Sequence, residues 1–192
     1  MTGAGLFVAL TTMAAFYRPV CLVCVTIPTV LLTHPGNGMR RTETSVSKGR
    51  TTMPMIDVYA AEGTFKDKHT LAKDLAAAVM RWEKVPDLAL FRNNTAAFVH
   101  DLPADSLSNV AGDSNYVRVQ VLTPVGVLDR DKQLGVVKEL TDIVAAAAGD
   151  PKLVDRTWVL ITESPEGGWG LGGHANTSAD IVAAARRELA GN

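Results

Sequence analysis

An internal repeat is the feature that most constrains how this 192-residue chain can fold. Within a domain at 53–192, the two copies span residues 54–115 and 116–175, and Gly63 and Gly126 hold the same place in each. Each copy opens and closes with a short apolar stretch and has a helical stripe of apolar residues between the two. Alternation with a period of two predicts a half-buried strand, and a spacing of three or four predicts an amphipathic helix. The repeat therefore predicts two β-α-β units.

The repeat and its C-terminal extension give seven expected elements. The first copy has a strand at 55–59, a helix at 66–82 with a capping box at Thr64 and Asp67, and a strand at 95–100. The second copy has a strand from Val117, a helix from Asp129 to Gly149 and a strand at 157–162; the apolar side of its helix carries Leu134, Val137, Leu140 and Val144. A final helix is capped at 176–180 and ends near Leu189. Parallel strands joined through a helix cross over with a right hand. We therefore expect an α+β fold, with tandem β-α-β units forming a four-stranded sheet and two helices on one face.

The closing strands of the two copies carry information about assembly. Residues 96–99 and 158–161 are apolar on both faces, so the helix-free face of the sheet needs a cover. No other expected element is large enough to provide it. Self-association through the open sheet faces is the solution we expect.

Charge and cysteine content exclude several classes of protein. The net charge of -1 leaves no basic field for nucleic acid. Both cysteines, Cys21 and Cys24, precede the repeat, so a disulfide framework is excluded and a reducing, cytoplasmic environment fits. Their spacing is that of a redox pair, but their apolar surroundings favour two small hydrophobic residues. No ligand cluster indicates a metal, and we expect no cofactor.

Residues 1–52 differ in character from the repeat and are expected to be disordered or absent from the mature protein. Their first part is mostly apolar, but Arg18 and Pro28 interrupt it, so neither part reaches the ~20 apolar residues of a membrane span. The later part is polar and typical of a linker. Three interpretations stand: an uncleaved anchor, a targeting segment, or sequence upstream of a true start at Met53. We favour the third because it alone leaves Pro54 with a free amine.

Two motifs at the ends of the repeat resemble one family. Met53-Pro54 directly precedes the first strand, and residues 157–173 read Thr-Trp-Val-Leu-Ile-Thr-Glu-Ser-Pro-Glu-Gly-Gly-Trp-Gly-Leu-Gly-Gly. From residue 54 to about 175 the chain resembles the tautomerase superfamily, in particular 4-oxalocrotonate tautomerase. The resemblance implies a β-α-β fold doubled in one chain, as in the cis-3-chloroacrylic acid dehalogenases, malonate semialdehyde decarboxylase and macrophage migration inhibitory factor. It also implies a homotrimer with sites at subunit boundaries, in agreement with the open sheet face.

The resemblance assigns Pro54 as the catalytic base. If Met53 is removed, the ring nitrogen of Pro54 becomes a free secondary amine, whereas an internal proline nitrogen is an amide without a basic lone pair. The reference pKa of an amino-terminal amine is about 8, and apolar surroundings lower it further. Such a base can remove a proton next to a carbonyl and return it at another carbon.

Three further residues take roles from the resemblance by position. Trp169 matches the aromatic residue that lines the pocket in 4-oxalocrotonate tautomerase. Trp158 falls where relatives place a substrate-binding arginine or tyrosine. Arg81 falls where the dehalogenases have a histidine that contacts the substrate.

The chain also departs from the family pattern. The arginine that follows the turn glycine in the family is replaced by Thr64 in the first copy and Val127 in the second. This loss argues against efficient dehalogenation, which needs positive charge to hold and polarise a carboxylate. Carboxylate binding would fall to Arg81, Arg92 or Arg118.

These observations predict a cofactor-independent tautomerase that isomerises a small 2-oxo or unsaturated acid between keto and enol forms. A lyase or hydratase of decarboxylase or dehalogenase type is the alternative, and there a cationic proline would act as the acid. A third possibility is a trimeric interaction protein that has lost catalysis. The expected partners are a small-molecule substrate and further copies of the chain, without nucleic acid or membrane.

Overall fold

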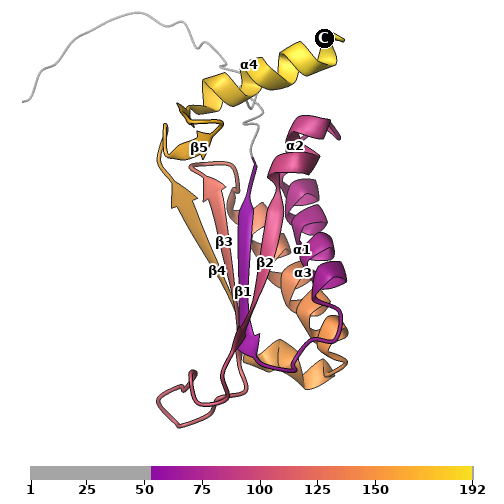
Figure 1. Cartoon of the computed structure of the whole chain (residues 1–192), viewed down its shortest axis with the longest axis vertical. Coiled ribbons are helices and arrows are strands. Elements are labelled where there is room, and N and C mark those ends of the chain that lie inside the picture. Colours follow the sequence, from indigo (N-terminus) through magenta and orange to yellow (C-terminus); the bar gives the residue numbers. More distant parts are fainter. Residues whose placement is uncertain (1–52, 192) are drawn as a thin grey trace, which may run out of the picture. The chain divides into compact units, whose positions relative to one another are not determined.

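A computed structural model describes residues 53–191, so the N-terminal segment with Cys21 and Cys24 lies outside the described residues. Figure 1 shows the elements, which in chain order are β1 (Met55–Ala61), α1 (Lys68–Glu83), α2 (Ala89–Asn94), β2 (Ala96–Leu102), β3 (Val117–Pro124), α3 (Arg130–Ala148), the 3-10 helix η1 (Pro151–Arg156), β4 (Thr157–Ser164), β5 (Trp169–Leu171), β6 (His174–Asn176) and α4 (Ser178–Leu189).

The main sheet has the strand order β2-β1-β3-β4. Within each repeat the strands pair in parallel, β1 with β2 and β3 with β4, and the two repeats join through the antiparallel pair β1–β3. Helices α1 and α3 pack side by side on one face (Figure 1). The predicted α+β fold, with a four-stranded sheet and two helices on one face, is confirmed.

The core lies between this sheet and the two helices. Alternate residues of the central strands point into it and are fully buried, and they meet the apolar stripes of both helices; the strand residues are Ile56, Val58, Ala60, Val117, Val119 and Val121. Burying a side chain of this size contributes about 1.5–3 kcal/mol. On α3 the stripe includes Val136, whereas Leu134 and Val137, expected on it, are 53% and 38% exposed. The helix is therefore rotated relative to the expectation.

The helix ends show where local sequence signals were sufficient. Asp129 caps α3 by accepting a hydrogen bond from the Lys132 amide at 2.9 Å, as expected. The predicted capping box at Thr64 is wrong, because α1 begins after Asp67, whose carboxylate accepts a hydrogen bond from the Thr70 amide at 2.9 Å.

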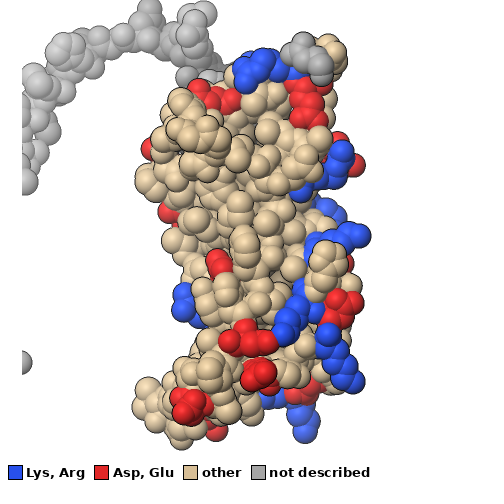
Figure 2. All heavy atoms as spheres, in the orientation of Figure 1, with Lys and Arg blue, Asp and Glu red and all other residues tan. Residues whose placement is uncertain are grey.

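The face of the sheet opposite the helices is exposed and mixed in character. It presents Phe98, Trp158 and Leu160, which are 40–51% exposed, and polar side chains of the central strands between them. In Figure 2 the surface over the strands is largely uncharged, whereas Lys and Arg gather along the side that carries the helices. Among the described residues, no helix is long and apolar enough to cross a membrane.

A second, smaller core closes the end of the sheet where β1 begins. It consists of Met53, Phe91 of α2, Trp169 of β5, and Ile181 and Ala185 of α4. Figure 1 shows α2, β5 and α4 together at this end. Neither α2 nor the β5–β6 hairpin was expected from the sequence.

Candidate functional site

Pro54 lies at the start of the central strand β1 and is buried. On one side its carbonyl oxygen accepts a hydrogen bond from the Ala96 amide of β2 at 3.4 Å. On the other side lies β3, where Leu122 pairs with Met55, so continuation of the register places Thr123 opposite Pro54. Pro54 is thus flanked by strands on both sides, and Met53, the residue before it, belongs to the second core.

Trp169 belongs to the same end of the molecule. It is 7% exposed and packs in the cluster that contains Met53, the residue before Pro54. The fold therefore brings the C-terminal motif and the N-terminal proline motif together, although they are separated by more than a hundred residues.

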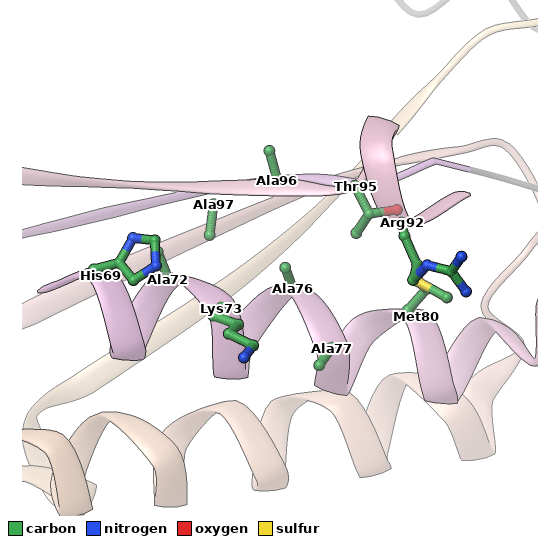
Figure 3. A pocket seen from close by; sticks show the side chains of 10 residues that line it. All are labelled: His69, Ala72, Lys73, Ala76, Ala77, Met80, Arg92, Thr95, Ala96 and Ala97. Carbon is green, nitrogen blue, oxygen red and sulfur yellow. The ribbon is translucent and has the colours of Figure 1, made fainter. Parts of the chain in front are cut away.

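Arg92 also lies at this end, on α2. Its guanidinium donates hydrogen bonds to the Asp87 side chain at 2.6 Å and to the Asp87 carbonyl oxygen at 3.1 Å. Arg92 lines a groove of about 420 Å³ between α1 and β2 (Figure 3). Thr95, the residue before β2, and Ala96, whose amide donates a hydrogen bond to the Pro54 carbonyl oxygen, also line it.

The groove has a positive lining and an apolar floor. Its cationic or titratable side chains are His69, Lys73 and Arg92, and none of its ten lining residues is acidic. Figure 3 shows Ala97 of β2 and Ala76 of α1 pointing toward one another across it. The hydroxyl of Thr95, at the end of the groove near Arg92, is buried and has no hydrogen-bond partner in the described part of the chain. Such a lining suits a small organic anion.

Arg81 is placed elsewhere, on the helical layer. It forms an ion pair with Glu139 of α3, which also accepts a hydrogen bond from the Trp82 indole at 2.7 Å. This arrangement links α1 to α3 on the helical layer.

Arg118 and Trp158 are register partners on the open face of the sheet, at the end opposite Pro54. Arg118 pairs with Tyr59 and lies 5.2 Å from the centroid of its ring, while Trp158 stacks on Tyr116 at 4.6 Å. Tyr59 lies four positions after Met55 on β1, about 13 Å away at the usual rise of a strand. One protomer therefore does not bring Arg118 or Trp158 to Pro54.

Sequence reasoning missed a buried carboxylate at the Pro54 end. Glu83 is 3% exposed, and one of its oxygens accepts a hydrogen bond from the hydroxyl of Thr123 at 2.7 Å. A signal for it exists, because Leu71, Leu75, Val79 and Glu83 follow one another at intervals of four residues. A glutamate that continues an apolar stripe of this spacing lies on the buried side of the helix.

Sequence reasoning also missed the partner of His100 on β2. Its Nε2 lies 2.7 Å from the carboxylate of Asp57, and its ring stacks on Tyr59 at 4.6 Å. These three residues occupy neighbouring positions on the open face, because the parallel register sets Tyr59 opposite His100.

Comparison with known proteins gives matches at the level of structure. No family model and no curated protein matches the sequence. A wild-type fused 4-oxalocrotonate tautomerase, solved as an asymmetric trimer, is 19% identical with a TM-score of 0.54, and the match covers 66% of this chain and 98% of that one. This chain has a tautomerase-like fold.

Two other solved structures agree with this tautomerase-like fold. A protein inactivated by 2-oxo-3-pentynoate is 16% identical with a TM-score of 0.55, covering 66% of this chain and 98% of that one. A macrophage migration inhibitory factor homologue from Prochlorococcus marinus is 17% identical with a TM-score of 0.50, covering 62% of this chain and 96% of that one. At these identities the likeness is one of fold.

Proposed function

We propose that this protein is a cofactor-independent tautomerase in which Pro54, as the amino-terminal residue, acts as the general base. The observation that carries the proposal is the placement of Pro54 at the head of the central strand of a tautomerase-like fold, buried beside the Trp169 cluster. The substrate class is a small 2-oxo or unsaturated acid. The Pro54 amine takes a proton from the carbon next to the carbonyl and returns it at another position, and so interconverts keto and enol forms.

Arg92 is the arginine that we assign to the substrate carboxylate within one protomer. It lines the groove beside Thr95 and Ala96, whereas Arg81 is not among the residues that line the groove and Arg118 lies at the opposite end of the sheet. A planar guanidinium can hold a carboxylate through two parallel hydrogen bonds. The exposed ion pair of Arg92 with Asp87 costs little to rearrange, because such surface pairs contribute about 0–1 kcal/mol.

The function is tested by comparing three proteins: residues 54–192 beginning at Pro54, the same protein with Pro54→Ala, and the full chain. Ketonisation of phenylenolpyruvate should be fastest for the first and about a hundredfold slower for the other two, the order of magnitude for loss of a general base. In the full chain the Pro54 nitrogen is an amide. Equal rates for all three folded proteins would refute the proline base, and a lack of activity in all three would favour an interaction protein.

The proposed assembly is a homotrimer, in which the open sheet faces meet and Arg118 and Trp158 of one protomer approach Pro54 of the next. The exposed Phe98 and Leu160 on this face support it, and the fused tautomerase of similar fold was solved as a trimer.

Sedimentation of residues 54–192 should give a trimer, and Leu160→Asp should dissociate it by placing a charge in the interface. Leu134→Asp is the matched control, because Leu134 is exposed on α3 and away from the sheet. A clean monomer for the parent protein at micromolar concentration would contradict the assembly.

A lyase or hydratase is a second candidate, and one observation favours it. In that chemistry Pro54 must carry a proton, and the buried carboxylate of Glu83 at the same end of the sheet would favour the protonated amine. The two candidates differ in the protonation state of Pro54 at neutral pH.

A further inference from the structure

The groove between α1 and β2 is long and apolar for most of its course. Its apolar lining on α1 runs from Ala72 to Met80, eight positions that span about 12 Å at the rise of an α-helix. Ala97 of β2 and Ala76 of α1 point toward one another across it (Figure 3). An alanine side chain ends at its Cβ atom, so the two walls leave room between them. The volume of about 420 Å³ lies within the range of small-molecule sites, about 300–1,000 Å³.

One end of this groove lies beside Pro54. Met55 pairs with Ala96, so continuation of the parallel register sets Thr95 beside Pro54. Thr95 lies on the helix-facing side of β2, because Ala97 points toward α1 and side chains alternate along a strand. The side chains of adjacent strand partners lie on the same face, so Pro54 shares this side of the sheet.

The polar groups of the groove favour a carboxylate at the Pro54 end. The Thr95 hydroxyl is buried without a hydrogen-bond partner in the described part of the chain, and Figure 3 shows its oxygen directed toward Arg92. Leaving a buried hydroxyl unpaired is unfavourable, so an acceptor that reaches it gains stability. A guanidinium next to this hydroxyl adds charge-assisted hydrogen bonds. At the far end His69 and Lys73 are exposed, and water weakens the pull of their charges.

The second repeat has a hollow in the corresponding place, between α3 and β4, and its lining differs. Two valines, Val137 and Val159, take part in it, and Glu163 brings a negative charge beside Arg130. The groove next to Pro54 has no acidic lining residue, so it is the better match for an anion.

We infer that the groove next to Pro54 binds a linear aliphatic carboxylate. The carboxylate group lies at Arg92 and Thr95, and the chain runs between Ala76 and Ala97, which determine the width that is accepted. The inference deepens the proposed function and rests on it for the chemistry: the substrate is then a 2-oxo or unsaturated acid with an aliphatic chain that extends from Pro54 along the groove.

The test is a calorimetric titration of the full chain with butanoate, hexanoate and octanoate. Each fully buried methylene tightens binding about fourfold, so octanoate should bind roughly tenfold or more tightly than butanoate even in an open groove. Ala97→Leu fills the groove and should remove this gain. Ala147→Leu is the matched control, because Ala147 is an exposed alanine of α3 outside the groove, and it should keep the gain. Equal affinity for the three acids, or a gain that survives in folded Ala97→Leu, would overturn the inference.

The position of the carboxylate group is tested at the two ends of the groove. Arg92→Gln should weaken octanoate binding about tenfold or more, the order of magnitude for loss of hydrogen bonds to a charged group. Lys73→Gln at the far end should weaken it less than about threefold. Both residues are exposed, so these variants test the inference even if Ala97→Leu does not fold. A larger loss in Lys73→Gln than in Arg92→Gln would overturn it.

Binding and turnover separate this inference from the proposed function. Binding that follows chain length, in protein that begins at Pro54 and is inactive, would keep the groove and refute the tautomerase. Activity on phenylenolpyruvate without any dependence of binding on chain length would do the reverse.

Discussion

Helix α2 depends on Glu188, a residue near the C-terminal end of the described chain. Replacing Glu188 gives the sharpest stability prediction. The N-cap residue Leu88 offers no side-chain hydrogen bond to the helix. Instead, the Glu188 carboxylate of α4 accepts hydrogen bonds from the amides of Ala89 at 2.7 Å and Leu90 at 3.1 Å. A negative charge at a helix N-terminus also interacts favourably with the helix dipole. Glu188 therefore takes the role that a local Ser, Thr, Asp or Asn usually plays.

The Glu188→Ala variant leaves both amides without their partner. Loss of an N-cap costs about 0.5–2 kcal/mol, and hydrogen bonds to a charged group contribute about 1.5–3 kcal/mol. Because the two amides sit at a partly exposed edge where water can replace the carboxylate, we expect a loss of about 2 kcal/mol, or about 6 °C in Tm for a domain of this size. Glu188→Gln keeps one acceptor and should lose about half as much free energy.

Denaturant unfolding at a fixed protein concentration measures these changes, since self-association would otherwise alter the apparent stability. Glu62→Ala is the control, because Glu62 is exposed and its side chain makes no hydrogen bond within the described residues; it should change the free energy of unfolding by less than about 0.5 kcal/mol. If the loss of unfolding free energy in Glu188→Ala were as small as in this control, the cap would have no energetic role, and α2 would be held by the burial of Phe91 alone.

Two further predictions concern acid stability and helix packing. The pKa of Asp180 lies below its ordinary value, mainly because the Thr177 hydroxyl and then the Thr177 amide donate hydrogen bonds to the carboxylate. This capping contribution is complete above the unfolded-state pKa of about 3.9 and is lost as pH falls through the lower folded-state value. The protection of the α4 amides, measured relative to their intrinsic exchange rates, should therefore fall below about pH 4, and Asp180→Asn should show the reduced protection already at about pH 6. Gly135→Ala would place a Cβ 2.1 Å from the Trp82 ring and should destabilise the protein by about 1–3 kcal/mol in denaturant unfolding, whereas a neutral effect would contradict the tight approach of α1 and α3.

The sequence was sufficient for the elements whose signals are local and periodic. The four main strands, α1, α3 and α4 follow from apolar spacing and from caps such as Asp129 and Thr177, because these signals act within a few residues. Helix α2 was not predictable in this way, since six residues are too few for a period and its cap comes from a residue 99 positions away. The rotation of α3 was missed because Val136 and Val137 are both apolar, and only packing against the sheet decides which is buried.

The site shows the same division between local and distant information. Pro54 and Trp169 come from motifs that stand in the sequence, and the structure places them at one end. The positions of the arginines depend on strand register and on ion pairs, so the sequence left Arg81, Arg92 and Arg118 equivalent, and the structure separates them.

The two repeats differ most at the ends where their first strands begin, because the end with Pro54 is covered and the end with Val117 is open. The antiparallel pairing of β1 and β3 sets these two starts at opposite ends of the sheet. The segment that follows β4, with β5, β6 and α4, packs only at the Pro54 end, where Trp169 and Ile181 exclude water. The other end has an exposed connection, residues 103–116, and the stacked Tyr116 and Trp158.

The segment that follows the second repeat therefore covers the end of the sheet where β1, the first strand of the first repeat, begins. Its consequence is electrostatic, because a dry environment strengthens the interaction between two charges that would be weak in water. At the Val117 end, Arg118 is exposed and interacts with the Tyr59 ring on an open surface. The asymmetry of the C-terminal extension, rather than the repeat itself, thus distinguishes the Pro54 end of a nearly symmetric sheet, and this is the end where we propose the acid–base chemistry takes place.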